Sequence, residues 1–185
     1  MPRTLLAILF CLSLQTAAQP PAATELPNAL RGSWAGILEY RDYSEPATST
    51  KRVKLPTWLT IQRAGTSNDL AFYYLYDDGP TKTVTEVSTV RIDAAANRYS
   101  ILDKAGKVED SYEIVGLADL RQGRGVLTLT GTGTENNAPA SVRTTLRVGR
   151  NILEIIRETA VADQPFTFRH AYTFVRQSPP TATAR

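Results

Sequence analysis

His170 is the only histidine in the sequence, and its imidazole is the only side chain whose ordinary pKa lies near neutrality. Alternate residues of a strand share a face, so His170 shares one with four aromatic residues, namely Phe166, Phe168, Tyr172 and Phe174. An imidazole on an aromatic face can act as an axial haem ligand or as a general base. The alternative is a packed histidine that is hydrogen-bonded to a neighbour and does no chemistry.

Two charged residues, Glu39 and Arg41, alternate on one face of the segment 32–43. They could pair or bind the polar group of a ligand, and the alternative is that they face solvent, since such charges are seldom buried. No serine lies in a Gly-x-Ser-x-Gly context, and no His, Cys or carboxylate cluster has the spacing of a metal site. We therefore predict no catalytic residue, no metal and no cofactor, which favours a protein that is not an enzyme.

Aromatic and aliphatic residues on the first, third and last predicted strands could line an internal cavity. Strands favour such residues in any case, so the pattern alone does not separate a cavity wall from a filled core. The candidate ligand-binding residues are Leu38, Tyr40, Tyr74, Phe168, His170 and Tyr172. A filled interior, without a cavity of roughly 300 Å³, would argue against ligand binding.

The first residues of the sequence have the pattern of an export signal, and the predicted strands follow it. Arg3 precedes an apolar run from Leu5 to Leu14, and small residues follow at positions 16–18, where a signal peptidase would read them. The run is about half the ~20 residues that span a bilayer. We therefore expect a signal peptide over 1–18, cleavage near Ala18, a periplasmic or extracellular location and no transmembrane segment in the mature chain. Cleavage would remove Cys11, the only cysteine, so the mature protein would have no disulfide.

The formal net charge of the full sequence is only +3, and no basic stripe is interleaved with aromatic residues. Both features argue against a nucleic-acid partner. A small apolar ligand is the expected partner, and the sequence leaves the oligomeric state open.

Alternation of apolar and polar residues runs through most of residues 26–177, which we expect to form one domain between flexible tails at 19–25 and 178–185. Turn-forming residues divide it into about ten strands, at 32–43, 53–61, 70–76, 84–92, 99–102, 111–115, 126–132, 141–148, 152–159 and 166–176. Short connections force antiparallel neighbours, and pairing the first strand with the last removes exposed edges. The sequence thus predicts an all-β fold, a single antiparallel up-and-down β-barrel closed by its first and last strands, with a helical turn over 26–30. Because Pro56 has no N–H, we expect its strand to be an edge or to carry a bulge there.

The first strand opens with Gly32, Ser33 and Trp34, a Gly-x-Trp pattern after a short turn, and the last strand carries Arg169 and Arg176. This arrangement resembles the lipocalin and wider calycin family. The resemblance implies that Trp34 closes one barrel end and that Arg176 or Arg169 packs across it. Ten strands without a C-terminal helix depart from the eight-stranded lipocalin, and the count is closer to fatty-acid-binding proteins or nitrobindin-type barrels. The segment 44–49 is too short for the helical lid of fatty-acid-binding proteins.

Three functions are consistent with these patterns. The first is an exported calycin-like barrel that binds a small, largely apolar ligand in its interior. The second is a filled barrel that serves as a structural or protein-interaction module of the cell envelope, with an exposed apolar patch or a free strand edge near Pro56. The third is a haem-binding or enzymatic barrel that uses His170.

Overall fold

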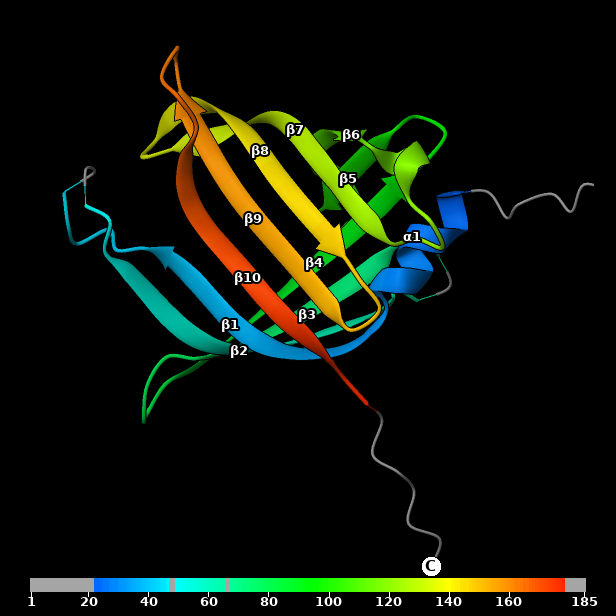
Figure 1. The fold of residues 1–185 in the computed structure, drawn as a ribbon, viewed down its shortest axis with the longest axis horizontal. Coiled ribbons are helices and arrows are strands. Elements are labelled where there is room, and N and C mark those ends of the chain that lie inside the picture. Colours follow the sequence, from blue (N-terminus) through cyan, green and yellow to red (C-terminus); the bar gives the residue numbers. More distant parts are fainter. Residues whose placement is uncertain (1–21, 47–48, 66, 179–185) are drawn as a thin grey trace, which may run out of the picture.

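The computed structural model describes residues 22–46, 49–65 and 67–178, and these form a closed antiparallel barrel of ten strands (Figure 1). The predicted all-β, up-and-down barrel closed by its first and last strands is confirmed. In chain order the strands are β1 (Gly32–Arg41), β2 (Arg52–Arg63), β3 (Leu70–Asp77), β4 (Thr83–Asp93), β5 (Arg98–Leu102), β6 (Val108–Val115), β7 (Gly125–Glu135), β8 (Ala138–Val148), β9 (Ile152–Val161) and β10 (Thr167–Gln177). A 3₁₀ turn, η1 (Leu117–Asp119), lies between β6 and β7.

The strand periodicity explains which side chains enter the core. In β2, Thr57, Leu59 and Ile61 are buried, whereas Trp58 and Thr60 between them are exposed. Successive side chains of a strand point to opposite faces, so one face of each strand packs inside the barrel and the other faces outward. The buried core contains large side chains from both ends of the chain, including Trp34, Phe72, Tyr112 and Phe174.

The ladder that closes the barrel runs between β1 and β10, from Ser33 opposite Gln177 to Tyr40 opposite His170. Gly36 lies in this ladder, and a Cβ atom built on it would fall 1.9 Å from the carbonyl oxygen of Thr173. Only glycine can occupy this position without moving the main chain of β10.

One end of the barrel is covered by the helix α1 (Ala22–Leu30), as Figure 1 shows. Leu26 and Leu30 of this helix are buried in the core. The helix begins before the predicted turn over 26–30, so residues 22–25, assigned to a tail from sequence, are helical. The predicted signal peptide and residues 179–185 of the predicted C-terminal tail lie outside the described residues. Within the described part of the chain, no helix has the length and apolar character needed to cross a membrane.

Two local expectations need correction. Pro56 lies within β2 between two neighbours, opposite Ile37 of β1, and not on an edge strand. The ladder between β2 and β3 ends at Thr57, so Pro56 leaves no bond of that ladder unmade. A bulge occurs instead in β10, where Phe168 faces Glu158 and His170 faces Arg157, leaving Arg169 as the extra residue, and a second register shift lies between β5 and β6.

Candidate functional site

The barrel interior contains a chamber of about 200 Å³. It is lined by side chains from α1 and from eight strands, β3 to β10, on both sides of the barrel, so it lies at the centre of the fold. Its apolar lining comprises Leu30, Phe72, Val90, Ile101, Leu129, Leu146 and Ile155. Its tyrosines are Tyr74, Tyr99, Tyr112 and Tyr172, and its polar lining comprises Glu86, Ser88, Thr144, Arg157 and His170. At about 200 Å³ the chamber is below the roughly 300 Å³ whose absence, by the criterion stated above, argues against ligand binding, and only a small molecule fits within it.

Three of the six residues proposed to line the interior do so, namely Tyr74, His170 and Tyr172. Leu38 and Tyr40 are half-buried on β1, opposite Tyr172 and His170 in the closing ladder, but they are outside the chamber lining.

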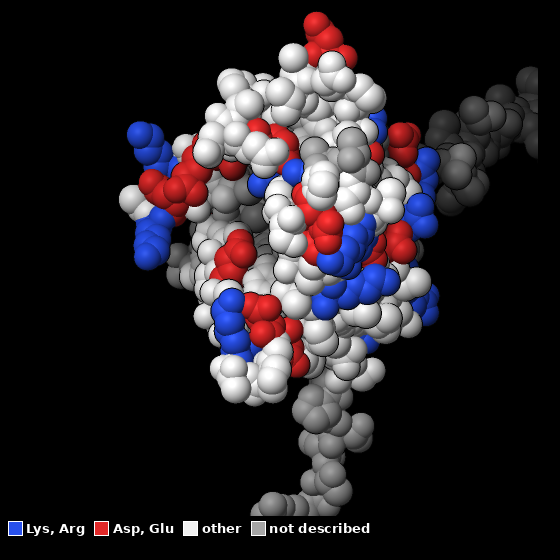
Figure 2. Space-filling view, turned by 90° about the vertical axis from the view of Figure 1, so that its left-hand side faces the viewer, with Lys and Arg blue, Asp and Glu red and all other residues white. Residues whose placement is uncertain are grey.

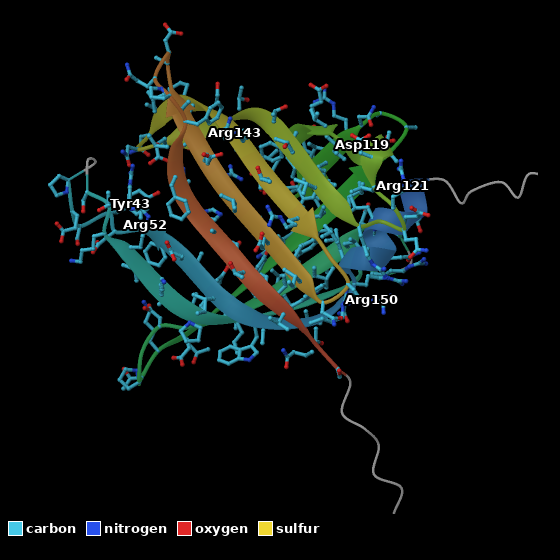
Figure 3. All side chains as sticks on the ribbon, viewed as in Figure 1. Tyr43, Arg52, Asp119, Arg121, Arg143 and Arg150 are labelled. Carbon is cyan, nitrogen blue, oxygen red and sulfur yellow. The ribbon has the colours of Figure 1, made fainter. Side chains whose placement is uncertain are left out.

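Phe168 is displaced from the chamber by the bulge at Arg169. Alternation from His170 had placed the two side chains on one face, but the extra residue inverts the alternation. The ring of Phe168 lies 4.6 Å from the guanidinium carbon of Arg52. Its register partner Glu158 pairs with Arg143, which Figure 3 shows on the outer surface.

Tyr74 and Tyr172 of the chamber lining belong to a larger aromatic cluster. The ring centres of Tyr74 and Tyr172 are 5.4 Å apart, and those of Tyr172 and Phe174 are 5.6 Å apart. The hydroxyl oxygens of Tyr76 and Tyr172 lie 3.0 Å apart and share a hydrogen bond. Burial raises the pKa of Tyr74, Tyr99 and Tyr172, so these phenols are neutral donors and acceptors near pH 7.

Two nitrogen-bearing side chains, Arg157 and His170, lie where the chamber opens. They are register partners on β9 and β10. Burial, with the positive charges of Arg157 and Arg169, lowers the pKa of His170 to about 4. His170 is therefore a neutral imidazole near pH 7, held beside a cation.

A vestibule of about 300 Å³ lies outside the chamber, and Arg157 and His170 line both. Its other walls come from Asp110, Gly133, Thr134 and Arg169. The vestibule forms because β6 and β7 pair only from Glu113 opposite Thr130 to Val115 opposite Thr128, so the two strands separate beyond this short ladder. Figure 2 looks onto the end of the barrel away from α1, which is hollowed and ringed by acidic and basic side chains.

A buried carboxylate ties several strands together at this open end. Glu135 of β7 accepts hydrogen bonds from Arg41 of β1 at 2.9 Å, from Arg169 of β10 at 2.6 Å and from Thr159 of β9 at 3.1 Å. Arg169 therefore lies at the open end and not beside Trp34. Glu39, which the sequence grouped with Arg41, forms a separate surface pair with Lys54 at 3.3 Å.

At the closed end, the guanidinium of Arg176 lies over Trp34, and the indole Nε1 of Trp34 donates to the carbonyl of Leu30 at 3.0 Å. Gly32 has a φ of +130°, and a Cβ atom there would fall 2.6 Å from Nη1 of Arg176. Gly32, Trp34 and Arg176 thus form one packed unit beneath α1.

Sequence reasoning missed Arg157, Glu86 and Glu135. The signal for Arg157 was present, because it continues the inward-facing series Leu153 and Ile155 on β9. A charge on an otherwise apolar strand face marks a buried partner or a ligand. Glu135 had no such signal, since its partners come from strands far apart in the sequence.

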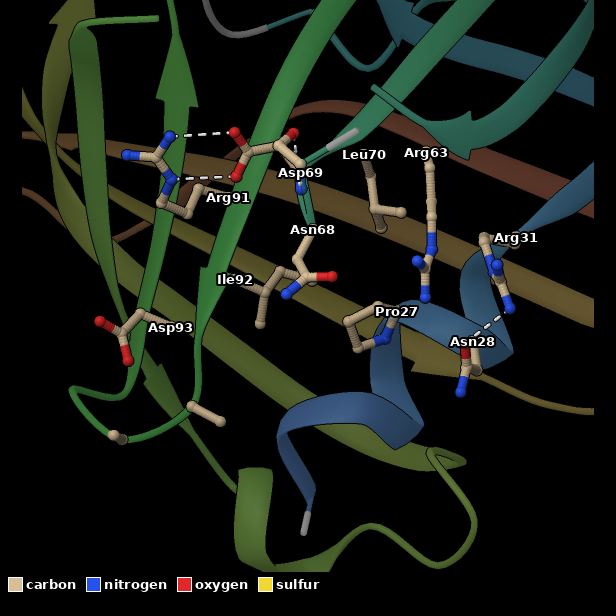
Figure 4. A pocket seen from close by; sticks show the side chains of 13 residues that line it. Pro27, Asn28, Arg31, Arg63, Asn68, Asp69, Leu70, Arg91, Ile92 and Asp93 are labelled. Carbon is tan, nitrogen blue, oxygen red and sulfur yellow. Dashed lines mark hydrogen bonds and ion pairs between the residues drawn. The ribbon is translucent and has the colours of Figure 1, made fainter. Parts of the chain in front are cut away.

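A further pocket, of about 640 Å³, is a surface groove between α1 and the hairpins that join β2 to β3 and β4 to β5. Figure 4 shows Arg31 and Arg63 on one side of this groove and the Asp69–Arg91 ion pair on the other. Arg31 donates to Asn28 at 2.7 Å, and Arg91 donates twice to Asp69 at 2.9 Å. These contacts hold the helix and hairpin side chains in place, and the groove has a mixed-charge surface, whereas the chamber has a largely aromatic and aliphatic lining.

The third sequence hypothesis, a haem bound through His170, does not fit the chamber as it stands. A porphyrin belongs with ligands whose pockets exceed 300 Å³, and the chamber of about 200 Å³ contains Tyr172 and Arg157 beside the imidazole. Haem would have to displace these side chains. Among the described residues, no group of three or more His, Cys, Asp or Glu residues is arranged to hold a metal ion.

The fold is similar to that of Rv2717c from M. tuberculosis, with a TM-score of 0.52 and 15% sequence identity, over 86% of this chain and 99% of that chain. A protein of unknown function from the DUF3598 family of Nostoc punctiforme matches with a TM-score of 0.41 and 17% identity, over 87% of this chain and 53% of that one. No protein-family model matches the chain, and no curated protein matches its sequence. At this level of identity, the likeness to Rv2717c shows the barrel fold alone.

Proposed function

We propose that this protein is an exported, calycin-like barrel that binds a small, largely apolar ligand in its interior. The observation that carries the proposal is the interior chamber, lined by aliphatic side chains and neutral tyrosines and next to a polar vestibule. Binding sites are typically concave and apolar with a few placed polar groups, and this chamber has that composition.

The size of the chamber indicates the size of the ligand. An apolar cavity of about 150 Å³ is enough to hold benzene in an engineered protein. A chamber of about 200 Å³ therefore suits one ring or a short branched chain, with any longer part extending into the vestibule.

Export is supported by the sequence of residues 1–18, and the calycin-like character by the Gly-x-Trp opening with Arg176 over Trp34. Expression of the full chain in a bacterial host tests export. We expect the product to be released from the cytoplasm with a new N-terminus near residue 19. A full-length product that stays in the cytoplasm would refute this part of the proposal.

Native mass spectrometry of the mature protein tests ligand binding. We expect a small molecule of about one to two ring equivalents to co-purify, or to bind from a panel of small aromatic compounds, with a stoichiometry of one. Ser88→Phe would fill the chamber and abolish binding. The matched control is Thr89→Phe, because Thr89 is the next residue of β4 and lies outside the lining. Equal binding by both variants would show that the ligand is not in the chamber.

A second candidate function, a protein-interaction module, is favoured by exposed apolar side chains on the outer barrel. Ile152, Val175, Trp58 and Leu75 are exposed, and the register places Val175 opposite Ile152 and Trp58 opposite Leu75. Ala35 joins the two pairs, because it lies opposite both Val175 and Trp58. If this row mediates self-association, sedimentation velocity will show a dimer of the wild type and a monomer of Trp58→Lys. A monomeric wild type at high concentration would count against it.

A further inference from the structure

Arg157 is the one arginine among the residues that line the chamber, and it lacks an acidic partner. No carboxylate of the described residues lies within 4.0 Å of its guanidinium. The neighbouring Glu158 points to the other face of β9, where it accepts a hydrogen bond from Arg143 at 2.8 Å. The positive charge of Arg157 is therefore not neutralised by an ion pair.

Most N–H donors of the Arg157 guanidinium also have no hydrogen-bond partner among the described residues. It has five N–H donors, and a single hydrogen bond, to the hydroxyl of Tyr112 at 3.2 Å, joins it to the rest of the described chain. A half-buried charge without a counter-charge is unfavourable unless a ligand or solvent compensates it. The free donors are positioned at the boundary between chamber and vestibule, where a ligand would pass or rest.

The other charged groups near Arg157 are already engaged or lie elsewhere. Arg169 is held by Glu135. Glu86 is on β4, across the closed barrel from β9, and accepts hydrogen bonds from Tyr76 at 3.3 Å and Ser88 at 3.4 Å. Asp110 is exposed on the vestibule wall and forms no ion pair with Arg157. At the boundary with the vestibule, Arg157 thus offers one positive charge that no ion pair neutralises, and the charge of Glu86 lies on the opposite strand of the barrel.

These observations define the charge of the best-matched ligand. A planar carboxylate accepts two parallel hydrogen bonds from a guanidinium and brings a single negative charge. A phosphate monoester brings about −1.5 to −2 at pH 7, more than one guanidinium offsets. A monocarboxylate matches Arg157 in both charge and shape.

We propose that the interior ligand is a small monocarboxylate, with its carboxylate on the guanidinium of Arg157 and its apolar body among Tyr74, Tyr172 and Phe72. This inference rests on the proposed function, because it assigns the chemical class of the chamber's ligand. The imidazole of His170 lines both chamber and vestibule, and the hydroxyl of Tyr112 is hydrogen-bonded to Arg157, so both can donate to the second carboxylate oxygen.

Isothermal titration calorimetry with three probes of one shape and different charge tests the inference. The probes are phenylacetate, phenylacetamide and phenethylammonium, with hexanoate and hexanamide as an aliphatic pair. We expect the mature wild type to bind each carboxylate at least about tenfold more tightly than its amide, with phenethylammonium the weakest.

Three variants test whether the carboxylate of the ligand binds Arg157. Arg157→Gln should reduce phenylacetate affinity to that of the amide, and Arg157→Lys should retain part of it, because an ammonium keeps the charge and loses the planar fork. Arg143→Gln, on the outer surface of the adjacent strand, should leave every affinity unchanged (Figure 3). Circular dichroism establishes that each variant is folded, and Arg157→Lys provides the test if Arg157→Gln does not fold.

The outcomes separate this inference from the proposed function. If amides and carboxylates bind equally, or if both Arg157 variants keep full carboxylate affinity, the carboxylate assignment is wrong while the chamber remains a binding site. If no probe binds and none shifts the NMR signals of Tyr74, Tyr172 or His170, both proposals are refuted for ligands of this size.

Discussion

The guanidinium carbon of Arg176 lies 3.9 Å from the centre of the Trp34 ring, and the two residues are direct partners in the ladder between β1 and β10. The same guanidinium donates to the main-chain carbonyls of Ala29, Arg31 and Arg150. Carbonyls at the end of a helix lack intrahelical partners, so Arg176 satisfies groups that α1 leaves free. One side chain thus joins α1, the first and last strands and the turn after β8.

Arg176→Ala should lower the free energy of unfolding by about 2–3 kcal/mol, because it removes a cation–π contact and several charge-assisted hydrogen bonds. Urea unfolding followed by circular dichroism measures this loss. Arg176→Lys should recover less than half, since lysine cannot reach three carbonyls with one planar group. The matched control is Arg150→Ala, because Arg150 contributes only its main-chain carbonyl and should change stability by less than about 0.5 kcal/mol (Figure 3). Equal losses in the two alanine variants would contradict this role.

Gly36→Ala should destabilise the barrel by about 3 kcal/mol, because the new Cβ would collide with the main-chain carbonyl of Thr173. The backbone atom cannot rotate away as a side chain would, so β1 and β10 must separate locally. Gly149→Ala is the control, since the nearest atom to its Cβ would be 3.4 Å away, an ordinary contact. The midpoints of thermal unfolding of the two variants are compared. Similar midpoints would show that the main chain of β10 moves at Thr173 to accommodate the new Cβ atom.

Glu135→Gln should cost about 3 kcal/mol of stability, because it leaves Arg41 and Arg169 without their shared buried carboxylate. Hydrogen exchange should also become faster at the open-end residues of β1 and β10, since these strands lose their tie to β7. Glu154→Gln serves as the control, because Glu154 pairs with Arg147 on the surface at 3.4 Å. Unchanged exchange in Glu135→Gln would show that the main-chain ladders alone hold the open end.

The imidazole of His170 should titrate in the folded protein with a pKa of about 4, and NMR of the ring protons measures it. The groups around it are Arg157 on β9, Arg169 on β10, Asp110 on β6, its register partner Tyr40 and the ring of Tyr172. The ordinary pKa near 6.5 applies to the unfolded chain, so the unfolded chain binds the proton more readily. Stability should therefore fall as the pH decreases from about 6.5 to about 4, by up to about 3 kcal/mol from this residue.

The His170→Gln variant isolates this contribution. Carboxylates that titrate at low pH affect both proteins alike, so the difference in unfolding free energy between wild type and variant should shrink between pH 6.5 and 4. A wild-type imidazole that titrates near 6.5 would show that His170 is solvated. Bound phenylacetate should raise this pKa, because its negative charge would offset that of Arg157.

The sequence by itself determined the strands and their closure. Alternation of apolar and polar residues with turn-forming residues between them is a local signal, and it placed ten strands close to where the structure has them. Short hairpins leave antiparallel pairing as the only option, so the barrel topology followed. The Gly-x-Trp opening and the arginines of the last strand also narrowed the partner of Trp34 to two residues, of which Arg176 is the one in contact.

Only the tertiary structure decided what the interior contains. The bulge at Arg169 depends on how β10 pairs with β9, and one extra residue was enough to remove Phe168 from the face that local alternation assigned to it. Glu135 meets Arg41 and Arg169 only after the barrel closes, because they are brought together from distant parts of the chain. The volume of the chamber is likewise the space that the side chains of the packed barrel leave unfilled. This volume depends on the size and packing of every inward-facing side chain, so no local pattern in the sequence specifies it.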